Sequence, residues 1–456
     1  MHGWTEDTEQ LARAVLDYTR YRLHLDPVPL DGPATPEELA KAAGTTITEG
    51  GLGGEEALRL FTEVLAPACL SIDNPRYLSF IPCAPTEAAT LFDLVVGASS
   101  IYGGSWLEGA GAVYAENQAL RWLADLAGLP PGAGGVFVQG GTIANLSALV
   151  AARHTARRRL DGRQPAHALA VAASAEAHSS IQAAAAVMDV ELLLVEPDAQ
   201  GRLTGEHLRA ALASRGGGGV ETHGVFAVVA SAGTTNLGIV DDLASVAETA
   251  EEGGCWLHVD GAYGGAALAA PSARPRFAGI ERADSFVVDP HKWLFAPFDC
   301  AALLYREPEL AREAHAQHAG YLEPTQEAGA WNPSDYAVHL TRRARGLPFW
   351  FSLATYGTAA YTKAVERTLA VARHAAEAVT HRDYLELLRP PDLSVVAFRR
   401  QGWSPSRYGE WSDRLLAAGV AFVVPSSHRG LPIARLAVVN PRTTEADIDI
   451  ILDSMA

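Results

Sequence analysis

Cysteine is scarce in this chain, and its spacing excludes two common architectures. The 456 residues contain four cysteines, with no Cys-x-x-Cys pair among them: Cys69, Cys83, Cys255 and Cys300. A disulfide framework or a zinc cluster needs more cysteines, or closer ones. The sequence therefore predicts free thiols and a reducing, cytoplasmic setting.

Long apolar runs and a basic leader are also missing. Residues 1–7 are acidic and lack the basic start and apolar stretch of a signal peptide. No uninterrupted apolar run is long enough to cross a bilayer. The formal net charge of −17 disfavours nucleic acid and anionic membranes as general partners. We expect a small-molecule substrate, with neither nucleic acid nor membrane as a partner.

The composition is that of a folded protein with more than one structural unit. Apolar residues make up 48% of the chain and charged residues 20%. A chain of this length exceeds one ordinary core. We predict a helical N-terminal segment over residues 1–84, a large domain over 85–350 and a small α+β domain over 351–456. Gly346 and Pro348 punctuate the second boundary.

Short β-rich runs alternate with Ala-rich helical stretches in the large domain. Strands are expected at 135–139, 169–172, 191–195, 225–231, 256–259, 285–288 and 301–305, and helices at 113–126, 142–160 and 180–188. This alternation predicts an α/β fold with a mainly parallel sheet covered on both faces. Ligands in such sheets bind at the carboxyl ends of the strands. In the small domain we expect one long helix over 352–379, then strands at 393–399, 420–424 and 433–439.

Lys292 follows the apolar run 285–288 and precedes Trp293. Most lysines are solvated surface charges, but this one lies at the end of a predicted buried strand. Burial favours the neutral amine, which attacks aldehydes. His291, beside it, could donate to a phosphate.

Asp260 ends another apolar strand, in the run His258-Val259-Asp260-Gly261-Ala262. A buried carboxylate there needs a partner. The protonated pyridine nitrogen of pyridoxal 5′-phosphate (PLP) is one candidate partner. A helix N-cap or a metal ligand would explain the residue equally well.

Two further turns follow predicted strands. The first contains Gly140, Gly141 and Thr142 at the start of a helix, where backbone N–H groups bind phosphate. Its spacing matches neither a P-loop nor GxGxxG. The second contains Thr234 and Thr235, whose hydroxyls could reach a cofactor or simply cap a turn.

Three histidines have open interpretations. His178 precedes a helix, and either caps it or stacks on a flat cofactor. His315 and His318 have metal-ligand spacing, but no acidic or cysteine cluster accompanies them, so we expect no metal. What decides between these alternatives is order along the chain: glycine-rich turn, histidine, Gly-Thr-Thr turn, strand-end Asp and Lys. Together they favour a PLP enzyme.

The run Asp289-Pro290-His291-Lys292-Trp293-Leu294, followed by Phe298-Asp299-Cys300, resembles the group II PLP-dependent amino-acid decarboxylases. These include the aromatic L-amino-acid, tyrosine, histidine and glutamate decarboxylases. The similarity extends from about residue 75 to the segment 440–444. It implies the aspartate aminotransferase-like fold (fold type I) and an obligate homodimer with active sites at the interface.

The resemblance also implies roles for individual residues. Lys292 would form the internal aldimine, Asp260 would pair with the pyridine nitrogen, and His178 and Ala262 would cover the two ring faces. The remaining cofactor contacts would come from Gly141, Thr142, Thr235, Asp289 and His291. Asp289 stands where the animal aromatic decarboxylase has Asn. Tyr321 matches the tyrosine of a mobile loop that reprotonates Cα of the quinonoid intermediate, although it could instead be buried as packing.

The substrate pocket is likewise inferred from the resemblance. Phe80, Ile81 and Cys83 would line it, with Tyr102 and Gly104 of the other subunit. No arginine in these runs suits a glutamate-type side chain. We therefore expect a lyase that decarboxylates an aromatic or apolar L-amino acid to its amine and CO₂. Such an enzyme would belong to amino-acid metabolism, and so to carboxylic acid metabolism. The alternatives are a PLP-dependent aldehyde synthase, aminotransferase or lyase, and a non-catalytic scaffold with the same fold.

Overall fold

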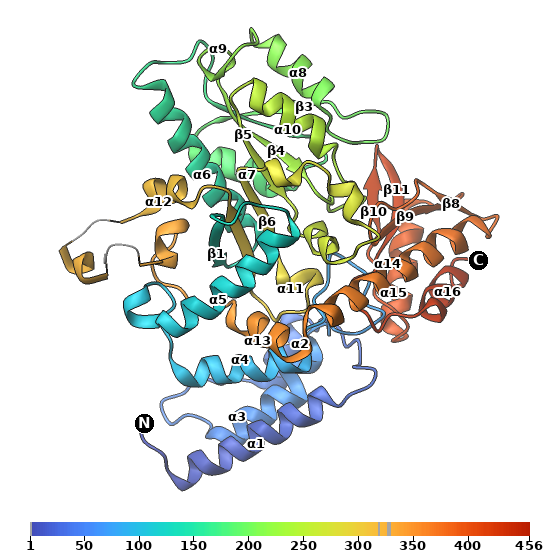
Figure 1. The fold of residues 1–456 in the computed structure, drawn as a ribbon. Coiled ribbons are helices and arrows are strands. Elements are labelled where there is room, and N and C mark those ends of the chain that lie inside the picture. Colours follow the sequence, from blue (N-terminus) through green and yellow to red (C-terminus); the bar gives the residue numbers. More distant parts are fainter. Residues whose placement is uncertain (1, 318–319, 326–329) are drawn as a thin grey trace.

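A mixed seven-stranded sheet forms the centre of the molecule (Figure 1). The computed structural model describes residues 2–317, 320–325 and 330–456. The strand order is β1-β7-β6-β5-β4-β2-β3, and β7 alone runs antiparallel to its neighbours. The strands are β1 (Gly134–Val138), β2 (Ala170–Ser174), β3 (Glu191–Val195), β4 (Val225–Ser231), β5 (Trp256–Asp260), β6 (Ser285–Val288) and β7 (Ala301–Tyr305).

Helices cover both faces of this sheet because its strands are apolar on both sides. In β6, Phe286 and Val288 belong to one core and Val287 to the other. The first core includes residues of α5 (Trp106–Leu126), α8 (Gly205–Ser214) and α10 (Leu243–Glu252). The second includes residues of α6 (Gly141–Leu160), α7 (Ser179–Met188) and α12 (Pro308–His315). The short helices α9 (Val220–His223) and α11 (Pro290–Trp293) lie in connections.

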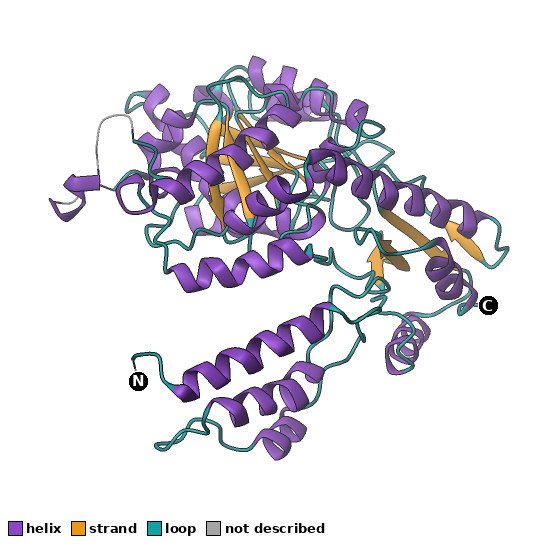
Figure 2. Ribbon diagram, turned by 60° about the horizontal axis from the view of Figure 1, so that its bottom comes forward, coloured by secondary structure: helices purple, strands orange, loops and turns teal. Residues whose placement is uncertain are grey.

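Three N-terminal helices extend from the body as an arm (Figure 2): α1 (Glu6–Leu23), α2 (Pro36–Ala43) and α3 (Gly54–Leu60). Thr5 caps α1, and Thr35 forms a capping box with Glu38 at α2. Within the described chain, α1 buries none of its residues. It packs partly against α3, and its Tyr18 ring makes an edge contact with Phe61.

The C-terminal part is a second, smaller layer. Its antiparallel sheet has the order β10-β11-β9-β8. The strands are β8 (Leu385–Leu387), β9 (Val395–Arg400), β10 (Ser426–His428) and β11 (Leu431–Ala437), and the helices are α14 (Thr358–Thr380), α15 (Pro405–Ala417) and α16 (Glu445–Asp453). Helix α4 (Glu87–Ser99) packs against α13 (Leu347–Tyr356), which joins this part to the large sheet.

All seven predicted strands of the large sheet form, and the α/β fold is confirmed. The antiparallel direction of β7 was not foreseen. The expected helix over 352–379 is wrong as one element, because Gly357 at φ +76° ends α13 and α14 begins after it. No strand covers 420–424 in the described chain, where Phe422 makes a single bridge to Tyr77. The proposed domain boundaries stay predictions.

Candidate active site

A cavity of about 460 Å³ opens at the carboxyl ends of β1, β4, β5 and β6. We call it the sheet-edge cavity. It brings together all nine residues predicted to hold a cofactor: Gly141, Thr142, His178, Thr235, Asp260, Ala262, Asp289, His291 and Lys292. Its volume falls in the range of pockets for small molecules and cofactors. Because carboxyl ends of parallel strands meet at one edge, residues distant in sequence converge here.

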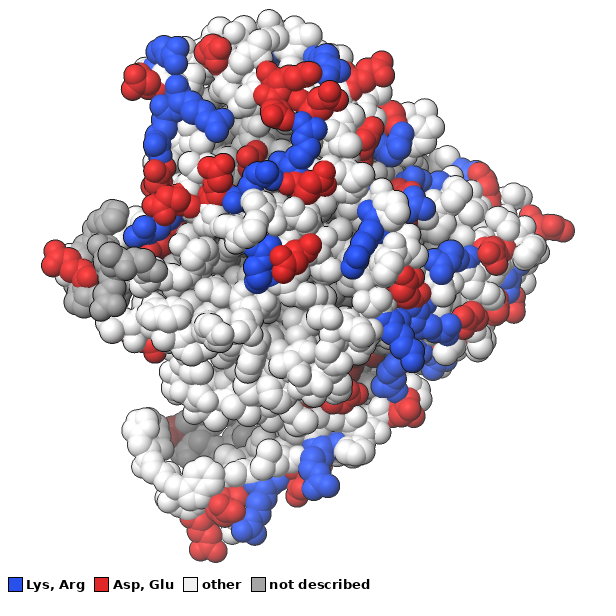
Figure 3. Space-filling view, in the orientation of Figure 1, with Lys and Arg blue, Asp and Glu red and all other residues white. Residues whose placement is uncertain are grey.

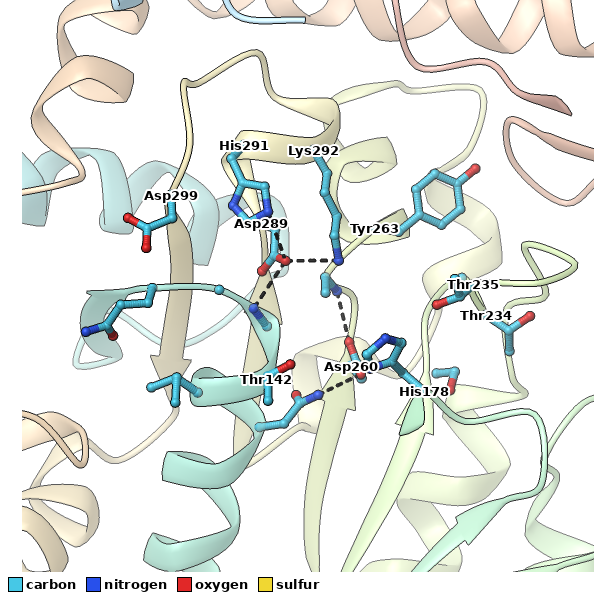
Figure 4. Close-up of a pocket in the computed structure, with 18 of the residues that line it drawn as sticks. Thr142, His178, Thr234, Thr235, Asp260, Tyr263, Asp289, His291, Lys292 and Asp299 are labelled. Carbon is cyan, nitrogen blue, oxygen red and sulfur yellow. Dashed lines mark hydrogen bonds and ion pairs between the residues drawn. The ribbon is translucent and has the colours of Figure 1, made fainter. Parts of the chain in front are cut away.

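Lys292 projects into the cavity from α11, the short helix after β6 (Figure 4). Its Nζ lies 3.0 Å from Oδ2 of Asp289, the residue that follows the last residue of β6. The Lys292 side chain is 25% exposed, whereas that of Asp289 is 1% exposed. The amine is therefore held by a buried carboxylate and remains accessible from the cavity.

The glycine-rich turn after β1 passes close to Asp289. Gly141 N–H donates to Asp289 Oδ2 at 3.2 Å. A Cβ at Gly141 would lie 3.1 Å from Cβ of Ala262 and 3.2 Å from the same carboxylate oxygen. A side chain at position 141 would therefore be tight, and Ala262 or Asp289 would have to move by a few tenths of an ångström. The turn also begins α6, and the N-terminal end of this helix suits a phosphate.

His291 lies beside this turn with its imidazole buried. The Cys300 peptide offers Nδ1 both a carbonyl oxygen at 2.8 Å and an N–H at 3.2 Å, so either tautomer is satisfied. Burial lowers the pKa of His291, which favours the neutral ring. When the peptide N–H donates to Nδ1, Nε2 carries the proton and faces Asp289 Oδ2 at 3.7 Å. That N–H can donate to an anion in the cavity.

Asp260 sits at the end of β5 with a donor on each carboxylate oxygen. Ala262 N–H donates to Oδ1 at 3.1 Å, and the Asn145 amide donates to Oδ2 at 2.9 Å. Asp260 is not a helix N-cap, because the next helix, Gly264–Ala269, has Tyr263 at that position. Its remaining lone pairs face the cavity, where a cationic N–H would pair with it.

The structure shows one of the two possible roles of His178, and its stacking on the cofactor stays a prediction. His178 is the N-cap of α7, because its Nδ1 accepts the Ser180 N–H at 3.2 Å. It also lines the sheet-edge cavity opposite Lys292 (Figure 4). Since Nδ1 is an acceptor in this cap, the neutral ring carries its proton on Nε2.

The Gly-Thr-Thr turn after β4 divides its two hydroxyl residues. Thr234 Oγ1 accepts the Ile239 N–H at 3.1 Å and so closes the turn. Thr235 lines the cavity, and its carbonyl accepts a hydrogen bond from Arg435 at 2.8 Å. Gly233 adopts φ +113°, which a residue with a side chain would rarely take.

The predicted substrate pocket does not form within one chain. None of its five residues lines the sheet-edge cavity. Phe80 is 59% exposed, and the Cys83 thiol is buried and donates to the Ala296 carbonyl at 3.1 Å. The Tyr102 ring occupies the space beside Gly104, where an added Cβ would clash with it. Tyr102 thus fills the space next to Gly104 within one chain, and the role of the five residues stays a prediction.

Two other expectations fall at the edge of what the structure describes. Tyr321 lies in the short 3₁₀ helix Gly320–Thr325, and its side chain is outside the described residues, as is all of His318. His315 is buried, and its Nε2 lies 3.0 Å from the Ser147 carbonyl. The role of Tyr321 as a proton donor therefore remains a prediction.

Four contributors were not among the predicted site residues: Asn145, His258, Phe298 and Asp299. Asn145 bridges Asp260 and His258, and Phe298 and Asp299 line the cavity mouth. The signal for His258 was its spacing, because residues two apart on β5 share a face with Asp260. Asn145 lies one helical turn after Gly141, facing the same edge.

The donor set suits PLP. The buried Asp289 Oδ1 has no hydrogen-bond partner in the described chain, as expected where a ligand completes the site. The N-terminus of α6, Thr142 and His291 would hold the phosphate, and Asp260 would hold the protonated ring nitrogen. Lys292 would bind the aldehyde carbon. These groups and the cavity define a PLP-binding enzyme.

Comparison with known proteins agrees. Residues 39–401 match the pyridoxal-dependent decarboxylase conserved domain. The chain is 28% identical to the aromatic-L-amino-acid decarboxylase of Bacillus atrophaeus, covering 97% of this chain and 93% of that protein. It is 32% identical to the L-2,4-diaminobutyrate decarboxylase of Rhizobium meliloti, covering 90% and 83%. The solved structure of Oryza sativa TDC with PLP and tryptamine superposes with a TM-score of 0.91 at 25% identity, covering 100% and 99%.

The chain belongs to the pyridoxal-dependent decarboxylase family. It is a PLP-dependent enzyme that decarboxylates an amino acid, a carboxy-lyase of fold type I. The predicted family, cofactor and reaction are thereby confirmed.

Proposed function

We propose that the substrate is an aromatic or other apolar L-amino acid. The observation that carries this proposal is the charge pattern of the sheet-edge cavity. Among the described residues that line it, Lys292 is the only lysine and there is no arginine. An acidic side chain would lack a cationic partner once Lys292 and the phosphate turn are committed to the cofactor. Phe298, 53% exposed at the cavity mouth, supplies apolar surface.

The residues of the chain divide the work of the reaction. Bound PLP supplies an electron sink for the electron pair left on Cα when CO₂ departs. Asp260 keeps the proton on the ring nitrogen, which maintains that sink. Lys292 Nζ would be displaced from the aldehyde carbon by the substrate amine, and would displace the product amine at the end of the cycle. Tyr321 is the proposed donor of the proton to Cα.

A diamino acid is the second candidate, and Asp299 favours it. This carboxylate lines the cavity and is 45% exposed, although Arg345 forms an ion pair with it. A cationic substrate side chain would compete with Arg345 for Asp299. An apolar substrate would leave the ion pair between Asp299 and Arg345 intact, and we prefer it for that reason.

An amino-acid panel separates these candidates. The wild-type enzyme, saturated with PLP, would be given L-tryptophan, L-tyrosine, L-phenylalanine, L-2,4-diaminobutyrate and L-glutamate, with CO₂ and amine measured by mass spectrometry. We expect release of the aromatic amines. Turnover of diaminobutyrate alone, abolished in Asp299→Asn, would overturn the apolar proposal.

The same panel tests the alternative reactions. An aldehyde synthase would release aldehyde and ammonia instead of amine, and an aminotransferase would yield a keto acid without CO₂. Tyrosine at position 321 supports simple decarboxylation, in which Cα is protonated. We expect Tyr321→Phe to raise the ratio of aldehyde to amine. Aldehyde as the main wild-type product would contradict the proposal. A non-catalytic scaffold would release no product from any panel member.

We also propose a homodimer. Large apolar side chains are exposed on α4 (Leu91, Leu94, Val95) and on α5 (Leu107, Tyr114). Figure 3 shows a broad surface without Lys, Arg, Asp or Glu over these helices. Such an exposed apolar surface suits contact with a second copy of the chain. Light scattering on the purified protein tests the assembly.

The cytoplasm is the proposed location. All four cysteines are free, and three of them, Cys83, Cys255 and Cys300, are buried. Free thiols suit a reducing compartment. In the described chain, no helix is both long and apolar enough to cross a membrane. Cell fractionation with antibody detection tests the location.

A further inference from the structure

A buried polar network connects Asp260 and His178 beneath the cavity, and Asn145 is its junction. Asn145 is 1% exposed, and three hydrogen bonds leave its amide. Nδ2 lies 2.9 Å from Asp260 Oδ2 and 2.9 Å from Ser180 Oγ, and Oδ1 lies 2.8 Å from His258 Nε2. Every polar atom of the amide is therefore used.

The direction of each bond follows from the ends of the network. Trp256 Nε1 is only a donor, and it lies 2.8 Å from Ser285 Oγ. The Ser285 hydroxyl then donates to His258 Nδ1 at 2.8 Å. Burial lowers the pKa of His258, so the ring is neutral and keeps its proton on Nε2.

His258 Nε2–H consequently donates to Asn145 Oδ1. The amide NH₂ is thereby directed toward Asp260 and Ser180. The Asp260 carboxylate can only accept a hydrogen bond, so it requires the same orientation of the Asn145 amide, with the NH₂ group toward Asp260. Ser180 receives one of these N–H groups and donates its own hydroxyl to His178 Nδ1 at 2.8 Å. One amide thus acts on both residues that face the cofactor ring.

We propose that Asn145 is a positioning residue for the cofactor. Its amide holds the Asp260 carboxylate toward the ring nitrogen and, through Ser180, supports the hydroxyl hydrogen bond to His178 Nδ1, which also accepts the Ser180 N–H. The proposal rests on the PLP assignment and not on the substrate class proposed above. It is tested without any amino acid, so its failure and that of the substrate proposal are distinguishable.

The principal variant is Asn145→Ala. It leaves Asp260 Oδ2 without its donor and His258 Nε2–H without its acceptor. We expect the apoenzyme to bind PLP about tenfold more weakly, the size of one hydrogen bond to a charged group. Without the Asn145 donor, Asp260 would hold the proton on the ring nitrogen less firmly. The ring would then withdraw less electron density from the cofactor's bond to Lys292. The pH midpoint of the bound cofactor's absorbance change should therefore rise, by about one unit.

Two matched variants separate positioning from general stability. Ser180→Ala cuts the branch to His178 but leaves both donors on Asp260, so its absorbance midpoint should equal that of the wild type. Thr155→Val alters another buried site on α6, where Thr155 Oγ1 has no hydrogen-bond partner in the described chain. It should change neither PLP affinity nor the midpoint.

If the alanine variant fails to fold, Asn145→Asp takes its place, because it keeps the shape of the side chain. Two adjacent carboxyl groups cannot both ionise freely, so one of them holds a proton. The titratable groups that face this site are Asp260 and His258 on β5, and His178 through Ser180. We expect the bound cofactor's absorbance to gain a second titration step.

The proposal is overturned if Asn145→Ala and Asn145→Asp both titrate as the wild type does. It is also overturned if Asn145→Ala only lowers the unfolding temperature of the apoenzyme while PLP affinity stays within twofold. A midpoint shift in Ser180→Ala as large as that in Asn145→Ala would refute the division into two branches.

Discussion

Lys292 Nζ lies 3.0 Å from Asp289 Oδ2, and the same oxygen accepts the Gly141 N–H of the turn that would hold the cofactor phosphate. One buried carboxylate therefore touches both the amine that binds the aldehyde and the turn that binds the phosphate. Bound PLP would be joined to this amine and would have its phosphate at the Gly141 turn, so the phosphate charge would lie near the Asp289 carboxylate.

Asp289→Asn removes this buried negative charge while keeping the shape of the side chain. Repulsion of the phosphate is relieved, and the Gly141 N–H still has an acceptor. We expect PLP to bind the apoenzyme about tenfold more tightly, measured by fluorescence titration. Weaker binding would show instead that the carboxylate itself supports the cofactor.

Lys292→Ala removes the amine on which the chemistry depends. We expect CO₂ release to fall at least about 10³-fold, because the chain offers no other amine in the described lining of the cavity. Borohydride reduction followed by mass spectrometry should attach PLP to the wild type and not to this variant. Lys363→Ala, on the exposed side of α14, is the control and should behave as the wild type. Full activity in Lys292→Ala would refute the assignment.

His315 gives a pH-dependent contribution to stability. Burial lowers its pKa from 6.5 to about 4, although its hydrogen bond to Ser147 opposes the shift. Between these values the unfolded chain binds a proton that the folded chain does not. Stability from this group is therefore present above pH 6.5 and is lost as the pH falls toward 4.

His315→Gln should remove that dependence. Relative to the wild type, the variant's free energy of unfolding should improve as the pH falls from 6.5 to 4, by up to about 1.4 kcal/mol per pH unit. Urea denaturation at a series of pH values measures the difference. A difference that stays constant across this window would mean that His315 does not titrate there.

Arg435 on β11 forms hydrogen bonds to two segments that are distant in the sequence. Its Nη2 donates to the carbonyls of Phe80 and Thr235, at 2.9 and 2.8 Å, and the residue is 7% exposed. Burial lowers its pKa to about 10. Arg435→Met should lower the free energy of unfolding by about 1–3 kcal/mol and weaken PLP binding through Thr235.

Arg399→Met is the matched control for this variant. Arg399 lies on the neighbouring strand β9, in an ion pair with Glu386 whose side chains are 31% and 47% exposed. Its loss should change stability by less than about 1 kcal/mol. Equal effects of the two substitutions on stability would show that the hydrogen bonds from Arg435 to Phe80 and Thr235 do not contribute to the stability of the fold.

Leu94→Glu tests the proposed dimer. Leu94 is 43% exposed on α4, one of the two helices with exposed apolar side chains. A charge there should dissociate the dimer and lower activity, as seen by light scattering and CO₂ release. Ile450→Glu, at a residue 50% exposed on α16, should leave the assembly intact. A dimer that survives Leu94→Glu would place the interface elsewhere.

Much of the fold followed from local patterns. Apolar runs bounded by turn residues predicted all seven strands of the large sheet, and Gly141 and Lys292 were placed at their ends. Local pattern failed at Gly357, because a helical periodicity continues on both sides of a residue whose φ of +76° ends the helix. It also failed for β7, whose direction depends on its neighbours.

The sequence by itself determined the chemistry: which side chains follow buried strands, and in what order they occur. Only the tertiary structure decided which of them touch. Asn145 and Asp260 are 115 residues apart and meet through one hydrogen bond, and Arg435 reaches Thr235 across 200 residues. Strand order and helix packing depend on burying both faces of the sheet at once, and residues distant in sequence determine that together. The periodicity of apolar residues within a single segment carries no information about strand order or helix packing.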